Sequence, residues 1–501
     1  MNGRCATLPP VTDVLPPSRP RDAADPALTA EEVARITGGR LLARSERRIR
    51  GAAVDSRLVH PGEVFVALPG ERTDGHEFLV AAVAAGAAAV IVTRAPSNPA
   101  SLGDVSVVRV ADGLAALHAL AAAWRSRFDP LVVGVTGSIA KTSTKEAVAA
   151  VLGQRLCVLK NDGNQNNEVG LPLTVLRLAP EHQAAVLEMG MYAGGEIADL
   201  ATIARPRIGV VTMVQPVHLS RIGSVEAIEQ AKGELIEALP PDGTAVLNAD
   251  DVRVRRMASR TAARSMTYGF AEDADVGAEA VESAGVDGMR FVLRAAGARR
   301  PVTIPTLGRL AVHNALAGAA VGLAAGLSLG DIAAGLAGGW AAPHRAELVR
   351  LGDVTIVDDS YNASPASVAA ALELLSGLPG RRVAVLGEML ELGEGHDAGH
   401  RATGEAAAGV VELLVVVGRG AAPIAAGARG AGLAADRVIE VADRDAAHDA
   451  LRPRLRGGDV VLVKASRGVA LDLLVDSLRA ELAEPRSDRA APGSASGAAA
   501  R

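Results

Sequence analysis

The sequence contains few cysteines: Cys5 and Cys157 are the only two in 501 residues. Disulfide-stabilised secreted domains are dense in cysteine, and thiolate metal sites need several cysteines at short spacing. Because these two residues are far apart in the sequence, we expect neither a disulfide framework nor a thiolate metal site. This composition favours a reducing cytoplasm as the compartment.

The sequence also lacks a hydrophobic run long enough to span a membrane. Its most apolar stretch, LVAAVAAGAAAVIV from Leu79, is shorter than the roughly 20 residues of a membrane helix. The pattern of this stretch predicts a helix followed by a buried strand. Residues 1–26 contain Pro, Arg and Asp without the apolar core of a signal peptide, so we expect a disordered leader and no export.

Positive charge is not in excess. Lys and Arg number 52 against 57 Asp and Glu, which gives a formal net charge of -5. The chain as a whole therefore does not attract nucleic acid or an anionic membrane, and an anionic ligand needs a local site. We expect no nucleic-acid partner and a monomeric protein.

What is present is the composition of a globular protein, with 49% apolar and 22% charged residues. At about 150 residues per domain, the length predicts three domains. Composition and turn residues place them at 27–128, 129–341 and 342–483. The last residues, 484–501, hold almost no large apolar side chain and are expected to form a disordered tail.

Apolar runs alternate with helical patterns in all three predicted domains, which is typical of α/β folds. In the first domain, the pattern from Leu28 predicts a helix that begins after a threonine cap and stops at Gly38 and Gly39. In the central domain, four runs that begin near residues 131, 184, 208 and 243 predict a parallel sheet, followed by a β-hairpin at 273–305 and two alanine-rich helices. The third domain restarts the alternation and predicts an open, Rossmann-like sheet with ligand groups at the carboxyl ends of its strands.

The stretch GVTGSIAKTSTKE, residues 134–146, follows a buried strand and opens a helix, which is the context of a phosphate-binding loop. Backbone N–H groups at a helix start can bind phosphates, Lys141 can neutralise them, and the Thr142 hydroxyl can ligate Mg²⁺. The general P-loop pattern is not met, because Ala140 stands where the last glycine belongs. A tight turn with an exposed lysine is the alternative interpretation.

The spacing of Thr136, Gly137, Lys141 and Thr142 resembles the ATP loop of the Mur ligase family. Five further motifs resemble the same family in the same order: NDGNQNNEVG from Asn161, LEMGMYAGGE from Leu187, HLSRIGSVEAIEQAKGEL from His218, DDSYNASP from Asp358 and VLGEMLELG from Val385. The resemblance implies a central P-loop-type ATPase domain between a domain that binds a UDP-sugar and a C-terminal ligase domain. It also implies that ATP and Mg²⁺ serve to join D-alanyl-D-alanine to UDP-N-acetylmuramoyl-tripeptide through an acyl phosphate.

The resemblance also implies roles for individual residues. Catalysis falls to Lys141, Glu188, His218 and Lys232, and Mg²⁺ would be held by Thr142, Glu188, His218 and Lys232, the last as a carbamate. ATP would be bound by Thr136, Gly137, Ser138, Ile139, Ala140, Lys141, Thr142, Ser143, Asn314, Arg345, Asp359, Tyr361 and Asn362. The two other substrates would be bound by Ser56, Arg57, Asn164, Asn166, Asn167, Lys464 and Arg467, of which the last two would hold the carboxylate of the dipeptide.

Each of these residues also has an ordinary structural interpretation: a helix lysine in solvent for Lys232, and locally bonded turns for the asparagines and for residues 359–362. The sequence departs from the family pattern near the nucleotide at Ala140, Met213, Leu310, Ala311 and His344. Two other functions therefore remain open. One is a family member that adds a single amino acid, or glutamate to folate. The other is a non-catalytic relative that binds a nucleotide sugar.

Overall fold

The computed structural model describes residues 26–70, 73–216 and 222–482. The chain divides into two compact units, residues 1–342 and 343–501. His218 lies outside the described residues, as do the expected leader and tail.

A five-stranded sheet forms the first part of unit 1, in the order β1-β5-β4-β3-β2, with only β1 antiparallel to its neighbour. Helix α1 begins after Thr29, whose side chain forms a capping box with Glu32, and it ends at the left-handed Gly38. The prediction of this helix is confirmed. The bounds are α1 Ala30–Thr37, β1 Arg40–Ala43, β2 Ala52–Ala53, β3 Val64–Val66, α2 Leu79–Ala84, β4 Ala89–Val92, β5 Ser106–Arg109 and α3 Gly113–Arg125.

The second sheet of unit 1 has nine strands in the order β14-β13-β12-β11-β10-β9-β6-β8-β7, and the seven strands from β12 to β7 are parallel. Parallel strands place their carboxyl ends at one edge, so the loops after β6, β8 and β9 lie together. The bounds are β6 Leu131–Thr136, β7 Val158–Lys160, β8 Ala184–Glu188, β9 Ile208–Val211, β10 Thr244–Asn248, β11 Arg264–Gly269, β12 Val276–Ser283, β13 Met289–Ala295 and β14 Ala298–Ile304.

The expected β-hairpin at 273–305 is a three-stranded antiparallel extension of this sheet. Strands β13 and β14 form the hairpin. Strand β12 pairs in parallel with β11 and antiparallel with β13, so it joins the hairpin to the parallel part of the sheet. The sequence did not indicate β12 as a separate strand, because its alternation of buried and exposed residues is weak.

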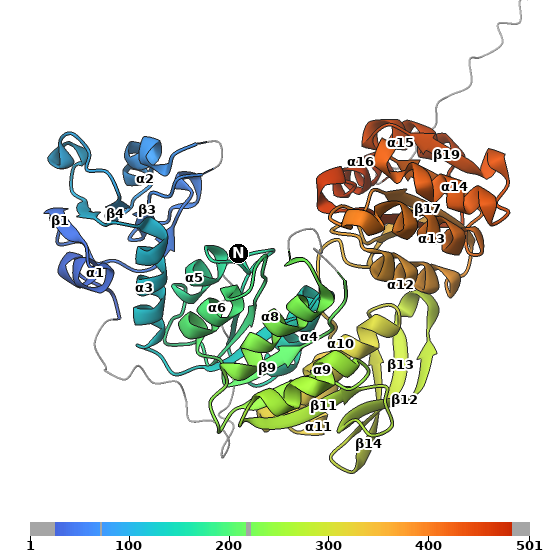
Figure 1. The fold of residues 1–501 in the computed structure, drawn as a ribbon, viewed down its shortest axis with the longest axis horizontal. Helices are drawn as coiled ribbons and strands as arrows, with labels where there is room; N and C mark the ends of the chain where they lie inside the picture. The colour runs from blue at the N-terminus through green and yellow to red at the C-terminus, as the bar shows by residue number, and fades with distance from the viewer. Residues whose placement is uncertain (1–25, 71–72, 217–221, 483–501) are drawn as a thin grey trace, which may run out of the picture. The chain divides into compact units, whose positions relative to one another are not determined.

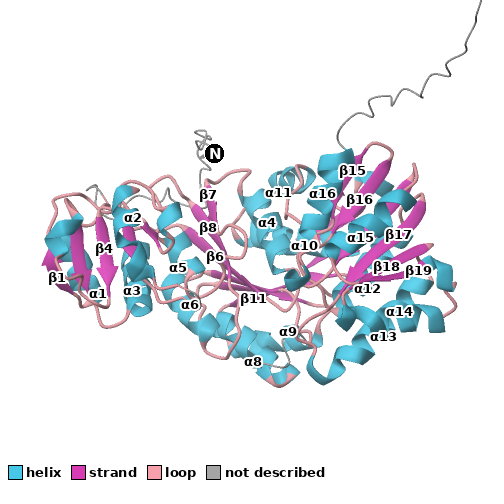
Figure 2. Cartoon of the chain, turned by 90° about the horizontal axis from the view of Figure 1, so that it is seen from above, coloured by secondary structure: helices cyan, strands magenta, loops and turns pink. Residues whose placement is uncertain are grey.

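Helices cover both faces of the nine-stranded sheet (Figure 2). Alternate strand residues point to two cores: one holds apolar side chains of α3, α5, α6 and α8, and the other those of α4, α10 and α11. Both faces are buried, which explains why the strands are runs of Val, Ile and Leu. The helix bounds are α4 Lys141–Leu152, α5 Gly170–Val175, α6 Glu196–Ala204, α8 Val225–Glu237, α9 Val252–Arg256, α10 Arg309–Ala324 and α11 Leu329–Ala337.

Unit 2 is built on a six-stranded sheet, β15-β16-β20-β17-β18-β19, in which only β15 is antiparallel. Helices α15 and α16 lie on one face, and α12, α13 and α14 on the other (Figure 1). The bounds are β15 Glu347–Leu351, β16 Val354–Asp358, α12 Pro365–Ser376, β17 Arg381–Gly387, α13 His396–Ala408, β18 Leu413–Val417, α14 Ala422–Gly430, β19 Val438–Val441, α15 Arg444–Leu451, β20 Asp459–Lys464 and α16 Asp472–Leu482.

Among the described residues, none of the helices has the length and apolar character needed to cross a membrane. The expectation about cysteine is wrong for Cys157, which is disulfide-bonded in the structure.

Candidate active site

The phosphate loop of the sequence connects β6 to α4. Thr136 ends β6 and donates from its hydroxyl to the carbonyl of Met189, 2.9 Å away. Gly137 has a φ of 149°, and a Cβ there would lie 1.8 Å from Thr212 Oγ1, so only glycine fits. The Ser138 N–H donates to the carbonyl of Met213 at 2.7 Å, and Thr212 Oγ1 donates to the carbonyl of Ile139 at 2.7 Å. The loop is therefore fixed against the end of β9.

Ala140 adopts a left-handed conformation, with φ 66° and ψ 0°, immediately before α4. An L-residue with a Cβ is disfavoured there by roughly 1–2 kcal/mol, whereas glycine is not. The side chain of Ala140 is also buried. The departure from the family pattern at this position thus carries a strain energy that a glycine would avoid.

The first turn of α4 brings its polar side chains toward the ends of β6 and β8. Lys141 Nζ donates to the carbonyl of Gly137 at 2.7 Å and to that of Ser138 at 3.3 Å. The Thr142 hydroxyl donates to Glu188 Oε2 at 2.8 Å. Asn166 Nδ2 donates to the other carboxylate oxygen of Glu188, 2.7 Å away. Thr142, Asn166 and Glu188 form one polar cluster from three separate segments.

This cluster has the donor chemistry of a magnesium site. Glu188 is buried, ends β8, and presents a carboxylate beside the Thr142 hydroxyl. Hard oxygen donors of this kind suit Mg²⁺, which usually retains several waters and needs few protein ligands. The residues present therefore fit the ion.

Lys232 lies on α8 with only 4% of its surface exposed. Burial, and then the positive charge of Lys141, hold the pKa of the Lys232 amine well below its usual value. Among the described residues, no carboxylate is paired with it. The sequence alone suggested a solvated helix lysine, but the fold buries this amine and leaves it within the electrostatic influence of Lys141.

The three asparagines of the NQNN turn have different surroundings. Asn166 contacts Glu188, as described above, and its backbone N–H donates to the carbonyl of Asn164 at 2.7 Å. Asn167 Oδ1 accepts from the N–H of Gly170 at 2.9 Å, at the start of α5. The sequence did not single out Asn161, whose side chain bonds both the N–H and the carbonyl of Glu188. Asn161 directly follows β7 and opens a run of polar turn residues, and this position in the sequence could have indicated a role at the site.

Asn314, expected to bind ATP, is buried on α10 and accepts from the Thr144 hydroxyl at 3.1 Å. Its neighbour His313 contacts Asn248 Oδ1 at 3.1 Å and packs against the ring of Tyr268. These bonds fix α10 against α4 and β10, the elements that carry the phosphate loop and the end of the sheet.

Ser56 and Arg57, expected to bind a substrate, lie in a short turn that follows β2. Asp55 accepts from the backbone and side chain of Arg57, and these bonds lower the pKa of Asp55 to about 2. The guanidinium of Arg57 is mostly exposed, and Ser56 lies between the two residues.

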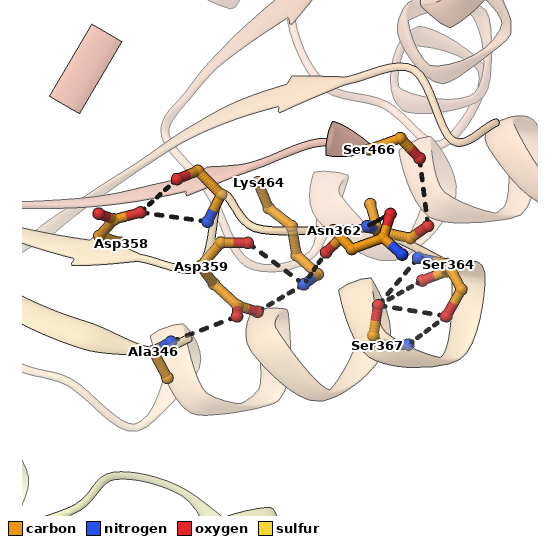
Figure 3. A network of polar contacts seen from close by, with 10 residues as sticks. Ala346, Asp358, Asp359, Asn362, Ser364, Ser367, Lys464 and Ser466 are labelled. Carbon is orange, nitrogen blue, oxygen red and sulfur yellow. Dashed lines mark hydrogen bonds and ion pairs between the residues drawn. The ribbon is translucent and has the colours of Figure 1, made fainter. Parts of the chain in front are cut away.

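In unit 2, the predicted residues gather around the turn that follows β16. Lys464 Nζ is 2.6 Å from Asp359 Oδ2 and 2.9 Å from the carbonyl of Asn362 (Figure 3). The guanidinium carbon of Arg345 lies 4.2 Å from the centre of the Tyr361 ring, and that of Arg467 lies 5.7 Å from it. All six predicted residues of this unit are therefore brought together.

Three family models match this chain: the Mur ligase family catalytic domain at residues 48–125, the Mur ligase middle domain at 135–322, and the Mur ligase glutamate ligase domain at 344–467. With full-length relatives above 30% identity, the chain belongs to the Mur ligase family. The fold class predicted from the sequence is confirmed.

Within that family, the chain is 41% identical to the UDP-N-acetylmuramoyl-tripeptide--D-alanyl-D-alanine ligase of Mycobacterium tuberculosis, over 91% of this chain and 98% of the relative. Among solved structures, it resembles MurF from Acinetobacter baumannii with a TM-score of 0.82 and 30% identity, over 90% of this chain and 98% of that one. It also resembles the MurF ligase of Thermotoga maritima in complex with ADP, with a TM-score of 0.76 and 30% identity, over 87% and 98% of the two chains.

Proposed function

We propose that this protein is an ATP-dependent amide ligase that joins D-alanyl-D-alanine to UDP-N-acetylmuramoyl-tripeptide in the synthesis of peptidoglycan precursors. The observation that carries the proposal is the identity to a ligase of this activity over nearly the whole of both chains. The polar cluster of Thr142, Asn166 and Glu188 supports it, because a binding-only relative has no need to keep a phosphate loop joined to a buried carboxylate.

The chemistry requires activation of a carboxylate, since its carbon is a poor electrophile and oxide is a poor leaving group. A carboxylate oxygen of the tripeptide attacks the γ-phosphorus of ATP, and the bond from phosphorus to the ADP oxygen breaks. The amine of the dipeptide then attacks the acyl carbon, the tetrahedral intermediate expels phosphate, and the amine loses a proton. The products are an amide, ADP, phosphate and a proton.

The residues of unit 1 serve the first of these steps. The N–H groups at the start of α4 and the ammonium of Lys141 bind the phosphates, where negative charge accumulates. Thr142 and Glu188 would hold Mg²⁺, which supplies Lewis-acid polarisation of the phosphoryl group when bound. His218 stays a predicted ligand.

Lys232 is proposed to carry a carbamate. Carbamate formation requires the neutral amine as nucleophile, and burial favours that form because it lowers the pKa of Lys232. Carbon dioxide adds to the nitrogen, a proton leaves, and the resulting anion has the charge of a carboxylate. A second cation nearby would stabilise this product.

The remaining predicted residues receive the other substrates. Ser56 and Arg57 would bind the UDP-sugar, Asn164 and Asn167 would line the junction with the peptide, and Arg467 would bind the carboxylate of the dipeptide. A cytoplasmic location and a monomeric state complete the proposal.

The test is phosphate release with ATP, Mg²⁺, UDP-N-acetylmuramoyl-tripeptide and D-alanyl-D-alanine, with each component omitted in turn. We expect release only with all four, together with a product whose mass is that of the joined peptide. Release with a single amino acid in place of the dipeptide would indicate another activity of the family. Binding of the UDP-peptide without any phosphate release would indicate a non-catalytic relative.

A further inference from the structure

All three N–H donors of the Lys464 ammonium already have acceptors within the protein. Lys464 ends β20 with 3% of its surface exposed, and its Nζ donates to Asp359 Oδ2 at 2.6 Å, to the carbonyl of Asn362 at 2.9 Å and to the carbonyl of Asp359 at 3.4 Å (Figure 3). A lysine ammonium has three donors and no acceptor. All three have acceptors in the turn of residues 359–362, between β16 and α12.

The turn of residues 359–362 also forms hydrogen bonds to the two neighbours of Arg345, His344 and Ala346. Asp359 Oδ1, the oxygen that Lys464 does not bond, accepts from the N–H of Ala346 at 3.2 Å (Figure 3). The N–H of Tyr361 donates to the carbonyl of His344 at 3.1 Å. Arg345 therefore lies between two anchored residues, and one of its anchors is the carboxylate that Lys464 binds.

Two arginine side chains lie near the aromatic ring of Tyr361. The guanidinium of Arg345 stacks over its ring at 4.2 Å, and that of Arg467 approaches the same ring at 5.7 Å. The side chain of Arg467 is 60% exposed, and its guanidinium pairs with the Asp472 carboxylate at 2.6 Å. Arg345 and Arg467, unlike Lys464, are thus placed where a phosphate or a carboxylate can reach them.

We infer that Lys464 is a positioning residue for the ligase reaction: through Asp359 it fixes the turn that orients Arg345 and Tyr361, and it does not itself bind the dipeptide. The inference rests on the proposed function. It replaces the expectation that Lys464 and Arg467 share the carboxylate of the dipeptide. That task falls to Arg467 alone, whose planar guanidinium suits a bidentate contact.

The two roles predict different kinetics for Lys464→Met. A residue that binds the dipeptide carboxylate affects the KM for the dipeptide and leaves the KM for ATP unchanged. A residue that positions Arg345 and Tyr361 affects kcat and the KM for ATP as well. We expect kcat to fall on the order of 10- to 100-fold, which is the effect of a displacement of about 1 Å in groups that orient substrates.

A second measurement is the preference of the enzyme for a dipeptide with a free C-terminal carboxylate over the dipeptide amide. D-alanyl-D-alanine and its C-terminal amide are compared as substrates of the wild type, Lys464→Met and Arg467→Gln. We expect the ratio of their kcat/KM values to be the same in Lys464→Met as in the wild type, and to move toward one in Arg467→Gln. The matched Arg467 variant controls for loss of any positive charge in this turn.

Loss of Lys464 leaves the Asp359 carboxylate without its cation, which alone can destabilise the unit. A second variant, Lys464→Met with Asp359→Asn, removes both charges, and we expect its melting temperature to lie closer to that of the wild type while kcat stays low. A rise confined to the KM for the dipeptide, or a loss of acid-to-amide selectivity in Lys464→Met, would overturn the inference. So would unchanged kcat and KM values. Absence of phosphate release by the wild type would instead refute the proposed function.

Discussion

The left-handed Ala140 gives a prediction that tests the phosphate loop directly. Its φ of 66° places a Cβ in a region that costs an L-residue roughly 1–2 kcal/mol, and Ala140→Gly removes this cost. The glycine also gives the unfolded chain more conformational freedom, which opposes the gain by about 0.4–1 kcal/mol. The difference is a stabilisation of roughly 0.5–1 kcal/mol.

A matched control exists in the same unit. Ala296 also has a positive φ, 51°, in the turn between β13 and β14, and it is exposed. Ala296→Gly relieves the same kind of strain outside the phosphate loop. We therefore expect both variants to raise the free energy of unfolding by similar amounts, and only Ala140→Gly to lower the KM for ATP, because it also removes a buried methyl group from the proposed phosphate loop.

The assay is urea denaturation of the wild type and both variants, followed by steady-state kinetics at varied ATP. At roughly 2–4 °C per kcal/mol for a domain of this size, the thermal shift of each variant is a few degrees at most, so denaturation midpoints are the better readout. A lower free energy of unfolding for Ala140→Gly than for the wild type would refute the assignment of strain to this residue. A similar fall in the KM for ATP in both variants would refute the effect of the methyl group.

Three further outcomes are expected. Glu188→Gln lowers kcat/KM on the order of 100-fold in the phosphate-release assay, because the carboxylate proposed to ligate Mg²⁺ is lost; activity within twofold of the wild type would contradict this role. Labelling with ¹³C-bicarbonate gives a carbamate resonance that is lost in Lys232→Gln and kept in Lys141→Gln, whereas a wild type without the resonance would exclude the modification. Asp397, and then Glu388, raise the pKa of His396, so its contribution to stability is complete below about pH 6.5 and is lost as the pH rises through the raised pKa. The side chain is partly exposed, so we expect less than about 1 kcal/mol between wild type and His396→Gln at pH 5.5, and a smaller difference at pH 8.5; equal differences at both pH values would contradict the assignment.

The local sequence predicted strands and helices correctly where the hydrophobic pattern was unbroken. The runs of Val, Ile and Leu at β6, β8 and β20 were recognisable because both faces of these strands are buried. Strands β11 and β15 were missed, because their sequences mix Arg, Glu or Ser with apolar residues and exposed or half-buried positions interrupt the buried ones. The expected domain limits and site residues stay predictions, and the structure supplies the contacts on which to test them.

The sequence by itself determined the family, the order of the motifs and the chemical type of each candidate residue, since these depend on side-chain identity and on short-range spacing. Only the tertiary structure decided which of those side chains has free bonding capacity. Lys232 and Lys464 are both lysines in polar motifs, yet one is buried without a carboxylate partner among the described residues, and the other is saturated by Asp359 and Asn362. The strain at Ala140 likewise arises from closure of the loop against β9, residues 208–211, which is far from it in sequence. Desolvation, hydrogen bonding and backbone strain depend on which segments the fold brings together, and a linear pattern does not contain that information.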